Sequence, residues 1–444
     1  MNNAVTFLFT LLPFALSRPP AALLQPLTPL PISVNISPSG AFSVHVNGSP
    51  TPYFTSAPTY FRANGALFST ADGTLTLAAP PSPPTPGVDA LGAFTRQELR
   101  WVGAGGSAPP FTTAVLTYAA LGAVVFEQVF PLGANGTAAP GAGAGDAVLS
   151  AWPAIALDPA DTARGAVAFG GRAFLEGSRP LAWGSAGAGL PSAGGRGGPL
   201  VLFDLAPPAA GAPGAAVALS SLTQHAVATS SLDAAPAPGA LSYGVLGTVA
   251  SLPPGFSVRT ILAATAGGAT AGMVRWGGLL RAHAGLGERP ADPTLDLLGY
   301  ATANGAYYYY KPGVGPDGKD MTYEDTLLEV VAVARNTSIP IQWLQLDSWW
   351  YTRGAGGGVE NWTATSTTFP HGLKWFHEQV GMPFVAHNRY WAADNVYATQ
   401  NGGGFAFDVE LDTQMSIPLE QRFWDELLQN ASEWGMIQYE QDWL

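Results

Sequence analysis

The chain has 444 residues, of which 19 are Lys or Arg and 31 are Asp or Glu, and its net charge is −12. This acidic balance excludes a basic nucleic-acid binder, while 47% hydrophobic and 11% aromatic residues suffice for a large core. The sequence contains no Cys, which excludes disulfides, thiolate metal sites and a cysteine nucleophile, and its length favours two domains.

The N-terminus predicts an export signal. An apolar stretch from Ala4 to Ala15 is followed by Ala15-Leu16-Ser17, which has small residues at the two positions that signal peptidase recognises. The stretch is too short to span a bilayer, and the alternative is a merely apolar N-terminus, because the α-amino group is the only positive charge before it. We expect residues 1–17 to be a signal peptide and the protein to keep no membrane segment after cleavage.

Several sequons agree with export, because N-glycosylation requires the secretory route. They begin at Asn35, Asn47, Asn135, Asn336, Asn361 and Asn430. Some sequons occur by chance in a chain rich in Ser and Thr. Together with the signal they predict a glycoprotein that is secreted or stays in the lumen of the secretory pathway.

Residues 31–265 show short β-type segments separated by turn residues. Two dipeptides, Asn47-Gly48 and Asp72-Gly73, favour hairpins, because Asn, Asp and Gly tolerate the positive φ angles of tight turns. No helical pattern lies between the segments, so we expect an antiparallel β-sandwich. Strands are expected at 42–46, 66–70, 73–77, 112–118, 123–130, 147–151, 166–169, 200–204 and 243–250. Three segments rich in Gly, Ala and Pro are expected to be mobile loops, namely 133–145, 184–198 and 206–216.

A helical pattern follows at about residues 270–284, where Met273, Trp276 and Leu280 form part of an apolar stripe and Gly285 ends it. We assign residues 266–294 to a linker helix between the two domains. Most Trp and Tyr residues of the chain lie at or beyond residue 300, which also indicates a change of domain.

From 295 to 444 the expected elements alternate between strand and helix. The strands are expected at 295–300, 341–347, 384–387 and 436–442, and the helices at 322–336, 372–380 and 417–434. Thr322 caps the first helix with Asp325 three residues later, and Pro418 and Gly435 mark the first turn and the end of the last one. This alternation predicts a parallel sheet, because a crossover helix returns the chain for parallel pairing. None of the strands leads into a Gly-rich phosphate turn, so we expect the first half of a (β/α)₈ TIM barrel rather than a doubly wound sheet.

Candidate functional residues gather where the second expected barrel strand ends. Trp343, Gln345 and Asp347 share one face of this strand, because alternate strand residues point the same way, and Trp349 and Trp350 follow. A carboxylate among aromatic rings suits a sugar, since the acid accepts hydroxyl hydrogen bonds and the rings pack against C–H groups. The alternative is a structural Asp that caps the next loop.

The third strand leads into a polar and aromatic segment in which His387, Asn388, Arg389 and Trp391 are expected to line the substrate site. This strand end lies at the expected rim of the barrel, where barrel enzymes place their chemistry. The alternative is that His387 is a satisfied core histidine and that Arg389 pairs with Asp394.

The fourth strand places Gln438, Glu440 and Asp442 on one face. Two carboxylates at this spacing are costly to bury unless they are paired or used, so an active-site pair is one explanation and a metal site is the other. Residues 408–412 offer a second ladder of carboxylates. That run lacks the ligand pattern of a calcium loop, and we expect a solvated hairpin and no metal site there.

With these strand-end residues, the segment from Leu295 to Leu444 resembles the catalytic barrel of the α-galactosidase and raffinose-synthase-like retaining glycoside hydrolases. The preceding sandwich resembles the β-supersandwich domain of that family. The resemblance implies that Asp347 and the Trp residues beside it bind sugar hydroxyls and that Asp442 is the nucleophile. Glu440 stands where the family commonly has Lys, which reverses the local charge. A complete barrel needs about 250 residues, and four expected strands leave no position for the acid/base that the family carries on its sixth strand.

These observations predict a secreted protein of the glycoside hydrolase type that acts on α-linked glycosides by a retaining mechanism and is inactive as this chain alone. The residues expected to bind the carbohydrate substrate are Asp347, Trp349, Trp350, His387, Asn388, Arg389, Trp391 and Glu440, with Asp442 catalytic. The mechanism needs no metal ion and no cofactor.

Two other functions compete with this prediction. One is a non-catalytic carbohydrate-binding protein, which the unplaced acid and Glu440 favour. The other is an extracellular structural protein in which the Gly/Ala/Pro-rich sandwich is the working part. In either case an incomplete barrel would have open strand edges, which favour self-association.

Overall fold

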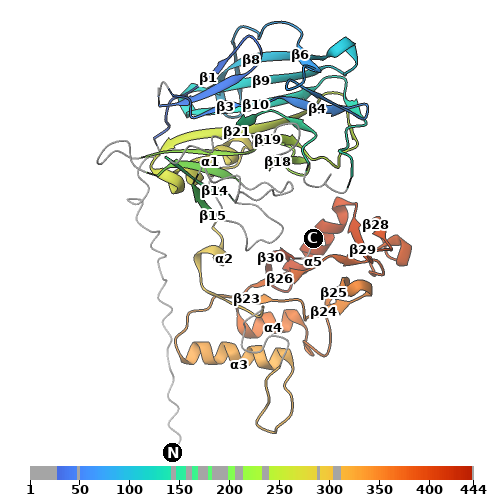
Figure 1. The fold of residues 1–444 in the computed structure, drawn as a ribbon. Helices are drawn as coiled ribbons and strands as arrows, with labels where there is room; N and C mark the ends of the chain where they lie inside the picture. Colours follow the sequence, from blue (N-terminus) through green and yellow to red (C-terminus); the bar gives the residue numbers. More distant parts are fainter. Residues whose placement is uncertain are drawn as a thin grey trace, which may run out of the picture. The chain divides into compact units, whose positions relative to one another are not determined.

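The computed structural model describes residues 28–47, 51–141, 147–156, 163–168, 179–182, 199–205, 214–232, 240–287, 291–303 and 312–442 (Figure 1). The chain divides into two compact units, Met1–Glu288 and Arg289–Leu444. The expected signal peptide lies outside the described residues, as do 142–145, 184–198 and 206–213 of the segments expected to be loops. None of the helices in the described ranges has the length and apolar character that a membrane-spanning helix requires.

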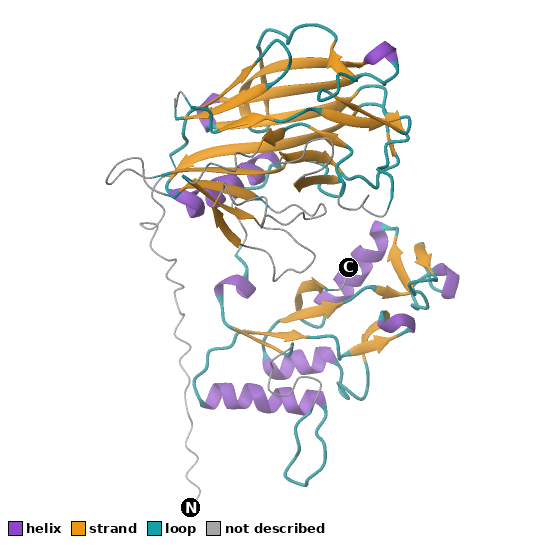
Figure 2. Ribbon diagram, viewed as in Figure 1, coloured by secondary structure: helices purple, strands orange, loops and turns teal. Residues whose placement is uncertain are grey.

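The first unit consists of antiparallel sheets (Figure 2). The larger main sheet has the order β15-β14-β16-β17-β21-β10-β9-β8-β6, with β7 also paired to β8. Its strands are β6 (Leu75–Leu77), β7 (Thr85–Asp89), β8 (Gly92–Gly103), β9 (Phe111–Tyr118), β10 (Ala123–Phe130), β14 (Arg164–Ala168), β15 (Arg179–Ala182), β16 (Leu200–Asp204), β17 (Ala215–Ser221) and β21 (Phe256–Ala266).

The smaller main sheet has the order β1-β2-β3-β13-β19-β18. Its strands are β1 (Ile32–Ile36), β2 (Phe42–Val46), β3 (Phe54–Ser56), β13 (Ala154–Ala156), β18 (Ala228–Leu232) and β19 (Ala240–Val245). Two minor sheets contain β4 (Tyr60–Ala63), β5 (Ala66–Ser69) and β12 (Ser150–Ala151), and β11 (Ala134–Asn135) with β20 (Ser251–Leu252). One buried cluster joins Val44 and Ile155 of the smaller sheet to Val124 and Phe126 of the larger one, so the expected antiparallel sandwich is confirmed.

The sequence of strand β10 is a nearly continuous apolar run because both faces of the strand are buried. Val124 and Phe126 point into the core between the sheets, whereas Val125 belongs to a second core on the other face. That second core includes Leu279 of helix α1 (Gly268–His283), and Trp276 of the same helix donates from Nε1 to the Ser220 hydroxyl of β17 at 2.7 Å. The helix expected near 270–284 is therefore present, and it covers the outer face of the larger sheet.

The hairpin expected at Asp72-Gly73 is wrong. Strand β5 pairs with β4 through a turn at Asn64 and Gly65, whose φ angles of 53° and 74° suit a two-residue hairpin turn. Strand β6, which follows Asp72-Gly73, pairs with β8 in another sheet. Asn64-Gly65 and Asp72-Gly73 both carry the residues of a hairpin turn. Only the first forms a hairpin, because β6 pairs with the distant strand β8 and not with β5.

The second unit contains a parallel sheet with the order β22-β23-β26-β30. Its strands are β22 (Gly299–Ala301), β23 (Trp343–Leu346), β26 (Phe384–Asn388) and β30 (Met436–Gln441), and its helices are α2 (Pro293–Asp296), α3 (Tyr323–Asn336), α4 (Leu373–Val380) and α5 (Gln421–Ser432). Leu344 and Phe384 on one face of this sheet share a core with Val331 of α3 and Phe376 of α4. The expected parallel pairing is confirmed, and the described residues of this unit form no closed barrel.

Helices α3 and α4 begin and end where the sequence predicts. The Thr322 hydroxyl accepts the Asp325 N–H at 3.0 Å and donates to the Asp325 carboxylate at 2.8 Å, which is the expected capping interaction. Gly381 ends α4 with a φ of 62°, a conformation that glycine adopts without strain.

Two expected elements of this unit are wrong at their starts. Residue 295 lies in α2, because Asp292 caps that short helix by accepting the Thr294 N–H at 2.9 Å. Pro418 lies at the end of strand β29 instead of in a helix, and α5 starts at Gln421.

A second sheet, with the order β24-β25-β27-β29-β28, was not predicted. Its strands are β24 (Tyr351–Arg353), β25 (Val359–Ala364), β27 (Trp391–Ala392), β28 (Phe407–Glu410) and β29 (Met415–Pro418).

Candidate functional site

Polar side chains meet at the carboxyl ends of β23, β26 and β30. His387 of β26 is in register with Glu440 of β30, and Gln345 of β23 is in register with the residue two before His387. Because alternate strand residues share a face, Asp347 continues the face of Gln345 and Asp442 continues that of Glu440. We call these five residues the carboxyl-end cluster. They lie on the face opposite the apolar core beneath α3 and α4.

Gln345 connects the first and last strands of the cluster. Its side-chain amide nitrogen donates to Asp347 Oδ2 at 3.1 Å and to Glu440 Oε2 at 2.9 Å. Its side-chain oxygen accepts the N–H of Thr302 at 3.0 Å, which fixes the orientation of the amide. Gln345 is 5% exposed. Its neutral side-chain amide therefore holds the Asp347 and Glu440 carboxylates from the buried side of the cluster.

Thr302 positions the loop that carries Asp347. It follows β22 and is fully buried, and its hydroxyl donates to the Gln345 carbonyl oxygen at 2.9 Å. The same hydroxyl accepts the N–H of Asp347 at 3.0 Å and the indole N–H of Trp349 at 2.9 Å. The Asp347 carboxylate in turn accepts the N–H of Ser348 at 2.7 Å. These bonds hold the first residues after β23 in one conformation.

His387 links β26 to Asp442 through a relay of hydrogen bonds. Its Nδ1 lies 3.0 Å from the Tyr351 hydroxyl, and its Nε2 lies 3.3 Å from Asp442 Oδ2. A carboxylate only accepts, so Nε2 carries the proton that points to Asp442, and Nδ1 is the ring nitrogen that meets the Tyr351 hydroxyl. Tyr351 thus holds the ring in the orientation in which Nε2 faces the Asp442 carboxylate.

Burial differs sharply within the cluster. The His387 side chain is 1% exposed, whereas the Asp442 side chain is 55% exposed. Asp347 is 9% exposed and is the most enclosed of the three carboxylates on the shared face, since Glu440 is half-buried. Ionised carboxylates are acceptors only, and this face therefore suits a ligand rich in hydroxyl donors.

The two Trp residues after Asp347 lie in the core and not on the rim. Trp350 is fully buried and packs against Trp362 and Trp434, with ring centroids 5.1 and 5.8 Å away. One face of Trp349 stacks on Tyr323 at 4.3 Å, and its indole nitrogen is used by Thr302. The other face of Trp349 lies against Phe369, with ring centroids 5.6 Å apart, so neither ring offers an open face to a sugar among the described residues.

Residues 388–391 are divided between the core and the surface. Asn388 is fully buried and donates to Gln441 Oε1 at 3.3 Å, since strand alternation turns it away from the face of His387. Trp391 is 3% exposed and packs edge-on against Phe423 at 5.1 Å. The Arg389 guanidinium lies over the ring of the adjacent tyrosine at 5.4 Å. Of the expected third-strand ligands, the structure brings only His387 into the cluster.

The carboxylate run at residues 408–412 forms the expected hairpin. β28 and β29 pair antiparallel, and Asp408, Glu410 and Asp412 are exposed. Across the described ranges, no group of three or more His, Asp or Glu side chains is arranged to hold a metal ion.

Sequence reasoning missed three residues that build the cluster. Gln345 was placed on the correct face but was not named as a site residue, although a buried amide beside an acid is a signal for a positioning group. Thr302 and Tyr351 gave no local signal. Their roles depend on contacts with residues 43 and 36 positions away, which only the pairing of strands reveals.

The chain matches no protein-family model and no curated protein sequence. Among solved structures it is similar to the alpha-N-acetylgalactosaminidase NagBb of Bifidobacterium bifidum. The likeness to the Gal-NHAc-DNJ complex has 13% identity and a TM-score of 0.53, and covers 92% of this chain and 67% of that chain. The GalNAc complex gives a TM-score of 0.50 at 13% identity and the same coverage. A GH36 alpha-galactosidase, AgaB of Geobacillus stearothermophilus, has 12% identity and a TM-score of 0.45, with 87% of this chain and 53% of that chain covered. The likeness to NagBb shows that the chain shares the fold of this alpha-N-acetylgalactosaminidase.

Proposed function

We propose that the carboxyl-end cluster is a glycoside-binding site and that the protein belongs to a divergent branch of secreted, retaining α-glycosidases. The observation that carries this proposal is the position of Asp347, Glu440 and Asp442 on one face at the carboxyl ends of parallel strands, held by Gln345 and His387. In barrel enzymes this edge carries the chemistry. The fold shared with NagBb, whose structures contain GalNAc or Gal-NHAc-DNJ, favours an α-galactose-type sugar as the ligand.

In the proposed reaction, an oxygen of Asp442 attacks the anomeric carbon as the glycosidic C–O bond breaks. The leaving oxygen takes a proton from a general acid, and the sugar remains bound to Asp442 as an ester. The general acid, now deprotonated, then removes a proton from a water molecule. This water attacks the anomeric carbon and releases the Asp442 carboxylate. His387 holds Asp442, while Asp347 and Glu440 accept hydrogen bonds from sugar hydroxyls.

The described residues of the cluster do not supply the general acid that this reaction needs. A retaining pair stands about 5 to 5.5 Å apart across the scissile bond. Glu440 lies on the same strand face as Asp442 and accepts from Gln345, so it is poorly placed to reach the leaving group from the other side. We therefore propose that the four parallel strands are half of a (β/α)₈ barrel and that the acid comes from elsewhere than these four strands.

This proposal predicts binding without turnover for the 444-residue polypeptide. Calorimetric titration with Gal-NHAc-DNJ should show saturable binding, and no 4-nitrophenol should be released from 4-nitrophenyl α-galactoside or its N-acetyl analogue. A polypeptide extended by four further strand–helix units should release it. Robust turnover by the unextended polypeptide that Asp442→Asn abolishes would contradict the missing acid, and absence of any binding would contradict the site itself.

We also propose that the protein is exported and that its mature form begins near Arg18, on the basis of the apolar N-terminus and the small residues before the cleavage point. N-terminal sequencing of protein recovered from the medium should read from about this residue. The exposed sequon residues should carry glycans, because their side chains are open to the transferase; they are Asn35, Asn47, Asn135, Asn336 and Asn430. An intact Met1 on the secreted product would rule out cleavage.

A further inference from the structure

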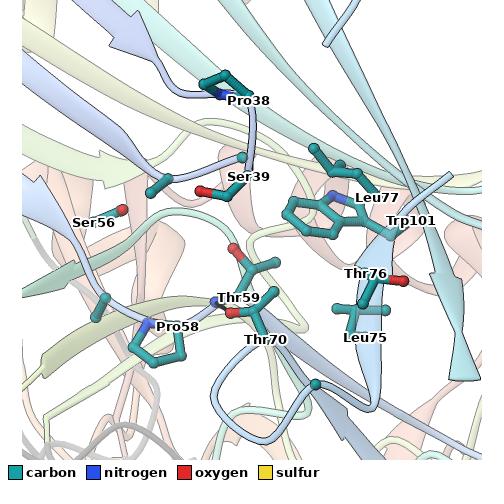
Figure 3. A pocket seen from close by; sticks show the side chains of 14 residues that line it. Pro38, Ser39, Ser56, Pro58, Thr59, Thr70, Leu75, Thr76, Leu77 and Trp101 are labelled. Carbon is teal, nitrogen blue, oxygen red and sulfur yellow. Dashed lines mark hydrogen bonds between the residues drawn. The ribbon is translucent and has the colours of Figure 1, made fainter. Parts of the chain in front are cut away.

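A cavity of about 590 Å³ lies in the first unit, where the ends of three sheets meet (Figure 3). We call it the sandwich pocket. The residues that line it are Pro38, Ser39, Gly40, Ala41, Ser56, Ala57, Pro58, Thr59, Thr70, Gly73, Leu75, Thr76, Leu77 and Trp101. None of these described lining residues is ionisable, although the chain has a net charge of −12.

The polar groups of the sandwich pocket are hydroxyls that retain hydrogen-bonding capacity. Ser56 Oγ accepts the N–H of Phe42 at 2.9 Å, and Thr70 Oγ1 accepts the N–H of Thr59 at 3.1 Å. A hydroxyl has one donor and two acceptor positions, so each keeps a proton to donate and a lone pair to accept with. In Figure 3 the Ser39, Thr59 and Thr70 side chains border the same space as the Trp101 indole.

Trp101 closes the inner side of the sandwich pocket. Its indole N–H donates to the Thr113 hydroxyl at 2.8 Å inside the core, and the residue is 2% exposed, so only a small part of its ring borders the pocket. Gly40 makes this possible, because a Cβ there would lie 2.6 Å from the indole and its φ is +86°. The more accessible apolar surface of the sandwich pocket comes from Pro38, Pro58 and Leu77, because Leu75 is 1% exposed.

Strand β6 adds main-chain groups to the rim. It is the last strand of its sheet and pairs only with β8 among the described residues. The N–H of Ala78 donates to the Arg100 carbonyl of β8 at 2.8 Å. Antiparallel strands direct alternate residues toward the partner, so Leu77 and Leu75 direct their amide groups away from β8, toward the open edge.

We propose that the sandwich pocket binds a neutral saccharide. A sugar offers hydroxyls that both donate and accept, and C–H faces that pack against apolar side chains, which matches the hydroxyls, the edge amides and the apolar side chains of Pro38, Pro58 and Leu77 in one cavity. Charged ligands are disfavoured, because no lining side chain compensates their desolvation. The volume lies within the range of about 300 to 1,000 Å³ usual for small-molecule sites. The site belongs to the first unit alone and is independent of the carboxyl-end cluster.

The test uses the full chain carrying Asp347→Asn and Asp442→Asn, which weakens the other site. Saturation-transfer NMR is recorded with raffinose, maltotriose and the charged trisaccharide trigalacturonate. We expect transfer to raffinose or maltotriose and none to trigalacturonate. Ala41→Trp, which fills the sandwich pocket, should abolish the transfer. Thr59→Val, which removes one hydroxyl at constant shape, should raise Kd at least fivefold.

Thr55→Val is the matched control, because Thr55 is exposed on β3 and lies outside the sandwich pocket, and its Kd should equal that of the parent. Circular dichroism of each variant checks that the sandwich is folded. If Ala41→Trp does not fold, the Kd of Thr59→Val decides whether the sandwich pocket binds the saccharide. The proposal is overturned if neither neutral trisaccharide receives transfer, if trigalacturonate receives as much, or if transfer is unchanged by both Ala41→Trp and Thr59→Val.

Discussion

Replacement of Asp347 by Asn is expected to weaken the binding of Gal-NHAc-DNJ about 100-fold. The carboxylate accepts the Ser348 N–H and the Gln345 side-chain N–H on the face that carries the cluster, where the proposed ligand would add its hydroxyl donors. Two charge-assisted hydrogen bonds to ligand hydroxyls contribute about 1.5 kcal/mol each, and 1.4 kcal/mol is a factor of ten in affinity. Isothermal titration calorimetry measures the change directly.

Asp408→Asn is the matched control for this prediction. It removes one carboxylate from the same unit, but Asp408 is exposed on the hairpin of β28 and β29. We expect its Kd to stay within twofold of the parent. Equal losses in both variants would show that net charge, and not a position in the cluster, controls binding.

Replacement of Trp350 by Ala is expected to destabilise the second unit by about 3 to 5 kcal/mol, which is the cost of removing a fully buried large aromatic side chain. Trp350 contacts Tyr351, Trp362 and Trp434, so the loss affects β24, β25 and the segment after α5 together. Hydrogen exchange of peptides from the second unit, followed by mass spectrometry, reports this loss as faster exchange while the sandwich peptides keep their protection.

Trp375→Ala serves as the control, because its ring is only partly buried and packs at a tilt against exposed His371, with centroids 4.3 Å apart. Its effect on exchange should be clearly smaller. A Trp350→Ala variant with unchanged exchange and lost sugar binding would place this ring in the ligand site, against the packing described here.

The elements that sequence predicted well are those whose signals are local. Thr322 and Asp325 cap α3 within one turn, and the alternation along β23 placed Gln345 and Asp347 on one face before any partner strand was known. The Trp residues after Asp347 were misplaced for the opposite reason. Trp349 is covered by Tyr323 of α3 and by Phe369, and Trp350 by Trp362 of the second sheet and by Trp434, and these long-range contacts have no periodic signal in the sequence.

The same distinction explains the start of α5. Pro418 fits the first turn of a helix, but it also fits the end of a strand, because it lacks the N–H that further pairing would need. Its pairing with Phe407 of β28 selects the strand. In the cluster, the bond between Tyr351 and His387 likewise joins two sheets. Candidate acids were therefore predictable from strand ends, whereas the residues that hold them were not.

The most direct test of the account is whether Asp442 becomes glycosylated. Fluoride leaves without a proton from an acid, so 5-fluoro-α-galactosyl fluoride can react with a retaining nucleophile even where the general acid is absent. After incubation of the 444-residue polypeptide, mass spectrometry should show one added fluorogalactosyl group on the peptide that contains Asp442. The Asp408→Asn variant should give the same product and Asp442→Asn none. An adduct on another carboxylate, or no adduct in a polypeptide that binds Gal-NHAc-DNJ, would contradict the assignment of Asp442 as the nucleophile.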